Sequence, residues 1–70
     1  MTEERKKQLY RDMKQGFEKA VEKDMSLTLY KMDLDLLKEK GLNPLVENVG
    51  FGMYLIEPFV MEGILLSGLL

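Results

Sequence analysis

The chain has 70 residues, a net charge of −2 and neither cysteine nor histidine. These properties limit it to one domain, exclude disulfides and remove the usual ligands of zinc, iron–sulfur and haem sites. A domain of this size buries only about 60% of the surface of its unfolded chain, so its stability is marginal without further support. We therefore expect one domain over residues 1–70, with no cofactor, that is stabilised by association in a reducing compartment such as the cytoplasm.

Residues 3–24 predict an amphipathic helix. Thr2 is a suitable N-cap, and Glu3 and Glu4 follow it where the helix dipole favours negative charge. Gly16 weakens the helix by about 1 kcal/mol relative to alanine. The apolar residues recur at helical spacing on one face: Leu9, Met13, Phe17, Ala20 and Val21.

The next segment, residues 24–41, predicts a second helix that begins after a bend near residues 24–26. Gly41 suits the left-handed position that ends a helix. One continuous helix over residues 3–40 is an alternative, and the alternation in the sequence SLTLY also fits a strand. The residues on one predicted helical face are Leu27, Tyr30, Leu34 and Leu37.

A third helix is predicted to begin with Asn43 as its cap and Pro44 in its first turn. Residues 50–70 fit a helix kinked at Pro58, or short strands with a hairpin turn at Glu62–Gly63. We favour helices and predict a mainly α domain of three or four helices. Its N-terminal helical hairpin, residues 3–40, would pack on the apolar segment 44–70, and an α+β fold with a short C-terminal hairpin is the alternative.

Charge is unevenly distributed along the chain. All ten lysines and arginines lie within residues 1–40, and the charged residues beyond them are Glu47, Glu57 and Glu62. Acidic residues interleave with the basic stripe of the first helix, which leaves little uncompensated positive charge to bind phosphates. We therefore predict no binding of nucleic acid. The basic stripe consists of Lys7, Arg11 and Lys14.

The apolar surface of residues 45–70 exceeds what the rest of the chain can cover, because nearly every position from 49 onward is apolar or glycine. Monomers rarely expose a contiguous patch of this kind. We predict a non-enzymatic protein–protein interaction module that acts as a small regulator or inhibitor. It would form a homodimer or larger homo-oligomer, and a larger target protein is a second candidate partner. The predicted interface residues are Phe51, Met53, Tyr54, Ile56, Phe59, Val60, Ile64 and Leu65.

Two other functions remain open. Residues 50–70 could dock on a membrane surface, although Glu57 and Glu62 oppose spanning it. An oligomer interface could also enclose a small-ligand pocket near Tyr54, Glu57 and Lys31. We predict no catalytic residues and no metal site, because Asp33 and Asp35 diverge on a helix and the common nucleophile–base pairs are absent.

Overall fold

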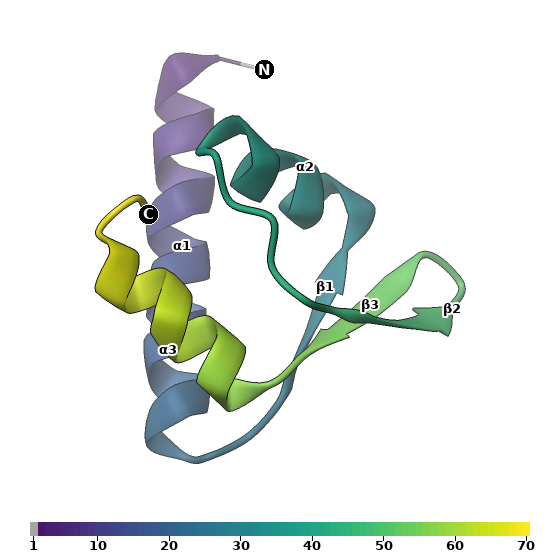
Figure 1. The fold of residues 1–70 in the computed structure, drawn as a ribbon. Coiled ribbons are helices and arrows are strands. Elements are labelled where there is room, and N and C mark those ends of the chain that lie inside the picture. The colour runs from purple at the N-terminus through teal and green to yellow at the C-terminus, as the bar shows by residue number, and fades with distance from the viewer. Residues whose placement is uncertain (1) are drawn as a thin grey trace.

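The computed structural model describes residues 2–70 and folds them into three helices and a three-stranded antiparallel sheet (Figure 1). The prediction of a mainly α domain is therefore wrong, and the α+β alternative describes the fold class correctly. Its hairpin lies earlier than expected, however, because the segment around Glu62–Gly63 is helical. The elements are α1 (Glu3–Glu22), β1 (Leu27–Tyr30), α2 (Lys31–Glu39), β2 (Glu47–Gly50), β3 (Met53–Ile56) and α3 (Pro58–Ser67).

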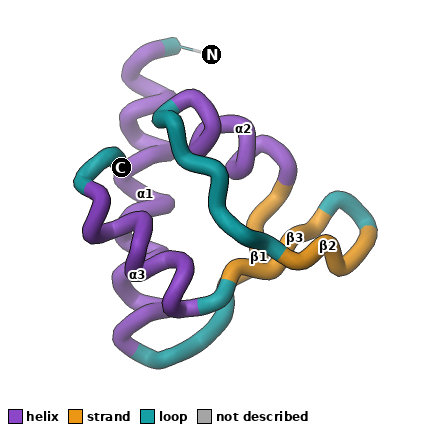
Figure 2. The backbone as a smooth tube through the Cα atoms, in the orientation of Figure 1, coloured by secondary structure: helices purple, strands orange, loops and turns teal. Residues whose placement is uncertain are grey.

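Helix α1 confirms the prediction for residues 3–24 to within two residues. The Thr2 hydroxyl accepts a hydrogen bond from the Arg5 amide at 3.2 Å, as an N-cap should. The apolar stripe turns inward, with Met13, Phe17 and Ala20 buried. This stripe packs on α3, which lies beside α1 (Figure 2).

The predicted helix over residues 24–41 is wrong in its first half. Residues 27–30 form β1, which alternates between buried Leu29 and exposed Thr28 and Tyr30. The Asp33 carboxylate then accepts a hydrogen bond from the Tyr30 amide at 2.9 Å, at the start of α2. Local spacing favours a helix here, but pairing with β3 decides the conformation, and that partner lies far along the chain. Gly41 has the predicted left-handed conformation, with φ of 80°.

Strands β2 and β3 form a hairpin where we predicted a helix starting at Asn43–Pro44. The turn is Gly50–Phe51–Gly52, and all three residues have positive φ, at 93°, 56° and 72°. A right-handed helix cannot continue through such a turn. The sheet order is β1-β3-β2, so β3 is central and the other two strands each have a free edge.

Pro58 starts a helix instead of kinking one. Glu57 is extended, with φ −88° and ψ 157°, as expected for a residue that precedes proline. Proline needs no amide partner in the first helical turn, so α3 begins there without cost. Gly68, with φ of 71°, follows the last helical residue.

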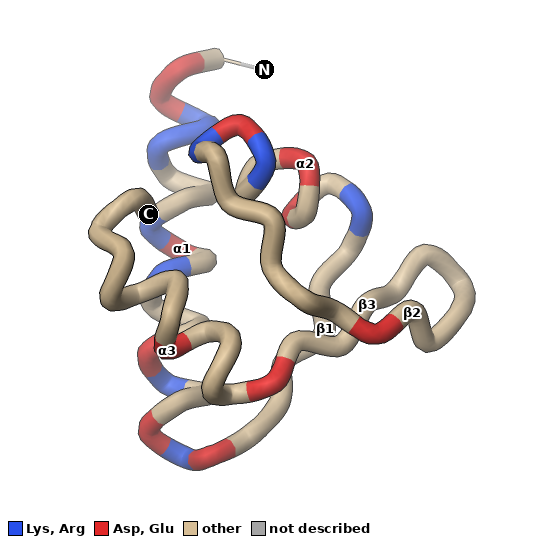
Figure 3. Tube along the Cα trace, viewed as in Figure 1, with Lys and Arg blue, Asp and Glu red and all other residues tan. Residues whose placement is uncertain are grey.

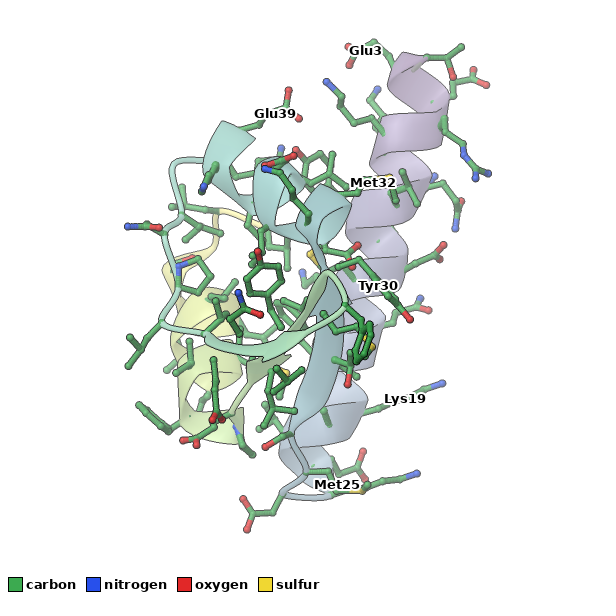
Figure 4. All side chains as sticks on the ribbon, turned by 90° about the vertical axis from the view of Figure 1, so that its right-hand side faces the viewer. Glu3, Lys19, Met25, Tyr30, Met32 and Glu39 are labelled. Atoms are coloured by element: carbon green, nitrogen blue, oxygen red, sulfur yellow. The ribbon has the colours of Figure 1, made fainter. Side chains whose placement is uncertain are left out.

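The core lies between α1, α3, α2 and one face of the sheet. The register pairs Leu27 with Ile56 and Leu29 with Tyr54 on that inner face. In Figure 4 the sheet lies in front of α1 and α3, and no helix crosses its other face. The buried residues are Met13, Phe17, Ala20, Leu29, Leu36, Leu37, Ile56, Met61 and Ile64.

Candidate protein-interaction surface

The eight predicted interface residues fall into three groups. Ile56 and Ile64 are buried in the chain's own core and are unavailable to a partner in the folded protein. Phe51 and Phe59 are exposed. The half-buried residues are Met53, Tyr54, Val60 and Leu65.

The uncovered side of the sheet, which we call the outer sheet face, consists of Thr28, Tyr30, Met53, Leu55 and, opposite Leu55 on β2, Glu47. The register places Tyr30 opposite Met53 and Thr28 opposite Leu55. Tyr30 is exposed, and Met53 and Leu55 are half-buried. We missed Tyr30 because we assigned it to the buried face of a helix, although the alternation in SLTLY was the signal that could have placed it.

A shallow apolar hollow extends this face toward α3. It has a volume of about 140 Å³, and Leu55 forms part of both surfaces. Leu45 and Phe59 border it with 76% and 65% of their surface exposed. We call it the hairpin hollow, and its lining residues are Leu45, Val46, Glu47, Leu55, Glu57, Phe59 and Val60.

Phe51, at the tip of the hairpin, is in an unfavourable conformation. Its φ of 56° is left-handed, a region that bulky side chains avoid at a cost of about 1–2 kcal/mol. Phe51 is also 97% exposed, so contacts within the chain do not offset that cost. Glycine would adopt the same turn without strain, as the two flanking glycines do. The aromatic ring at this position therefore needs an explanation other than folding.

The surroundings of the hairpin hollow are acidic. Glu47 and Glu57 both line it and are exposed. Figure 3 shows that the lysines and arginines lie on α1 and α2 or at their C-terminal ends, and that the C-terminal elements carry acidic residues and no basic ones. The hollow therefore favours a ligand that combines an apolar group with positive charge.

Within residues 2–70 the structure shows no grouping of potential metal ligands. That part of the chain contains no cluster of acidic residues able to hold a metal ion and no buried polar side chain. The two groups with perturbed pKa values lie between α1 and α2 and do not line the hairpin hollow. A hydrogen bond from Lys6 to Glu39 raises the pKa of Lys6, and burial raises the pKa of Tyr10.

The residues of the proposed small-ligand pocket do not come together in one chain. Glu57 lines the hairpin hollow, whereas Tyr54 pairs with buried Leu29 on the inner face and Lys31 is exposed on α2. Among the described residues, no helix has the length and apolar character needed to cross a membrane. Comparison with protein-family models, curated proteins and solved structures gave no match.

Proposed function

We propose that this protein is a non-enzymatic protein–protein interaction module that acts as a small regulator or inhibitor by occupying a partner's surface. Its working surface consists of the hairpin hollow, the outer sheet face and the tip residue Phe51. These features lie on the hairpin and on the elements next to it, and a partner lying along the hairpin would cover them together.

The exposed, strained Phe51 carries the proposal. A left-handed phenylalanine costs stability, and this one gains no contact within its own chain. Strain of this kind persists where it serves a purpose outside folding, and aromatic side chains dominate the energetics of many protein interfaces. Contact with a partner would bury the ring and offset the strain.

The partner's chemistry follows from the hollow. Its apolar residues, among them Leu45, Leu55 and Phe59, fit an aliphatic or aromatic side chain. Glu47 and Glu57 beside them favour lysine or arginine next to that side chain, and residues 41–70 contain no basic residue that could compete. We therefore expect a partner segment with a bulky apolar residue flanked by basic ones.

Selection from a random peptide library displayed on phage tests this proposal, with the immobilised full-length protein as bait. We expect enrichment of peptides in which a large apolar residue adjoins lysine or arginine. Phe59→Glu should weaken the binding of a selected peptide by about tenfold or more, as expected for a residue at the centre of an interface.

Leu66→Glu is the matched control. Leu66 is 80% exposed and lies on the same helix, but it does not line the hollow. The control should bind the peptide as the unmodified protein does. Selection without a common motif, or equal binding by both variants, would contradict the proposal.

A further inference from the structure

Strand β1 has a free edge that is ready to pair with another strand. The sheet order leaves β1 bonded to β3 alone. The Tyr30 amide donates to the Asp33 carboxylate at 2.9 Å, so it points away from β3. Because hydrogen-bonding direction alternates along an antiparallel strand, the amide and carbonyl of Thr28 point to the same free side. Exposed edges of this kind are templates for pairing.

A groove runs along this edge between β1 and α1. Two hollows, of about 260 and 230 Å³, share Gly16 and Leu27 and so form one continuous surface. We call it the β1 groove. Gly16 lies at its middle, where the lack of a side chain lets another chain approach closely. Figure 4 shows α1 flanking β1 on the side opposite the hairpin, with Lys19 and Met25 toward one end.

The two ends of the β1 groove carry opposite charge. Asp12 and Asp33 line one hollow, and Lys19 and Lys23 line the other. The Asp12 carboxylate accepts a hydrogen bond from the Gln8 side-chain amide at 2.8 Å. The ion pairs formed within residues 2–70 involve other residues, namely Lys6 with Glu39 and Lys31 with Asp35.

This polarity favours a second copy of the chain as the occupant. Asp12 lies four residues before Gly16 and Lys19 lies three residues after it, so each is about one helical turn from the middle of the groove. A two-fold axis near Gly16 would place the acidic end of one copy against the basic end of the other. Two-fold interfaces are self-complementary in this way.

We propose that two copies associate about such an axis, with their β1 strands antiparallel and Thr28 opposite Thr28 of the partner subunit. The amide and carbonyl of Thr28 then bond to their counterparts, and Leu27 meets Leu29 of the partner subunit in the apolar layer. Two sheets of three strands become one continuous sheet, and the two α1 helices cross at Gly16. The dimer presents two outer sheet faces on one side and leaves both hairpin hollows free, so it does not depend on the proposed function.

Sedimentation velocity over a series of protein concentrations, from low to high micromolar, tests the dimer. Thr28→Pro removes the central amide donor, and proline is tolerated on an edge strand where the amide faces solvent. We expect the unmodified protein and Thr28→Val to dimerise and Thr28→Pro to remain monomeric. Amide exchange at Thr28 should slow as the dimer forms.

A charge-reversal cycle keeps the proposal testable even if Thr28→Pro fails to fold. Asp12 and Lys19 are exposed and seven residues apart, too far for a direct ion pair in one helix. Asp12→Lys and Lys19→Asp should each weaken dimerisation by about tenfold through like-charge repulsion, and the double variant should restore it.

Several results would overturn the proposal. They are a monomer at every concentration, a dimer insensitive to both Thr28→Pro and charge reversal, and a double charge-reversal variant that dimerises no more tightly than the single variants. A monomer whose Thr28 edge pairs only with a strand of another protein would also overturn it. Peptide binding at the hairpin hollow would survive any of these outcomes, because the two surfaces are separate.

Discussion

The N-terminal region, residues 2–40, and the C-terminal region, residues 41–70, both supply the core but differ in what they present to water. Helices α1 and α3 show the contrast, since they pack on each other. The exposed side of α1 is largely charged, whereas α3 exposes Phe59 and Leu66. Water solvates charged side chains well, whereas exposed apolar side chains lower the free energy when another molecule covers them.

Side-chain hydrogen bonds follow the same division. In the N-terminal region two of them join α1 to α2: Lys6 donates to Glu39 at 3.1 Å and the Tyr10 hydroxyl donates to the Leu36 carbonyl at 2.8 Å. In the C-terminal region they stay local, as in the bond from Ser67 to the Ile64 carbonyl. The C-terminal region is therefore held mainly by apolar burial and by the sheet, which leaves its outer side chains available for binding.

Phe17→Ala should have the largest effect. Phe17 is fully buried in the core on α1, and truncating a buried phenylalanine costs about 3–5 kcal/mol. A small domain has little stability to spare, so we expect the variant to be largely unfolded. Urea denaturation followed by circular dichroism measures this, and a loss below about 1 kcal/mol would show that the core is not packed as described.

Tyr10→Phe tests the polar link between α1 and α2. It removes the hydrogen bond to Leu36 and should cost about 1 kcal/mol at neutral pH. Burial raises the pKa of Tyr10 above 10.0, so the folded state holds this proton more tightly than the unfolded state does. Its contribution is complete below pH 10.0 and declines as the pH rises through the folded pKa.

The stability difference between the unmodified protein and Tyr10→Phe should therefore narrow in strongly alkaline solution. Lys6, whose pKa is also raised, loses its stabilising charge over a similar range in both proteins, so the variant will still show some alkaline destabilisation. Denaturation curves at neutral pH and above pH 10.0 make the comparison. A constant difference would mean that the Tyr10 proton is not linked to folding.

Phe51→Asn should act in the opposite direction. Asparagine tolerates the left-handed conformation better, so relief of strain should stabilise the chain by about 0.5–1 kcal/mol. The same change should weaken binding of a selected peptide, if Phe51 belongs to the working surface. Thermal denaturation and peptide titration of the same preparation give both quantities, and a destabilised variant would mean that the ring supports the fold.

Phe59→Ala should have the smallest effect. Phe59 is 65% exposed, and surface substitutions usually change stability by no more than about 0.5 kcal/mol. Comparison with Phe17→Ala, measured at the same chain concentration, contrasts a core phenylalanine with a surface one. If Phe59→Ala lowered the free energy of unfolding by several kcal/mol, Phe59 would belong to the core and not to the surface.

Features that depend on near neighbours were predictable. The stripe of α1, its Thr2 cap and the left-handed Gly41 all follow from spacing or from the conformational preference of one residue. The uneven distribution of charge and apolar residues also follows from the sequence, and it directed attention to the C-terminal region. The set of predicted interface residues mixes core residues with surface residues, because Ile56 and Phe59 look alike until the fold is known.

Features that depend on distant pairing were not predictable. The segment SLTLY fits both periods, and four residues cannot form a strand until Met53–Ile56 lies beside them. Tyr30 therefore appeared as part of a helix although it lies on the outer sheet face. Pro58 likewise suggested a kink, because the start of α3 is recognisable only once the preceding residues are known to form a strand.

The sequence by itself determined that α1 is amphipathic, that this short chain has no disulfide or histidine ligand to stabilise it, and that apolar surface is concentrated near its C-terminus. These properties depend on composition and on contacts within a few residues. Only the tertiary structure decided which strands pair, which apolar side chains are buried and which edge of β1 remains free. Those outcomes depend on contacts between residues far apart in the chain, whose free energies outweigh the weak local preferences of short segments.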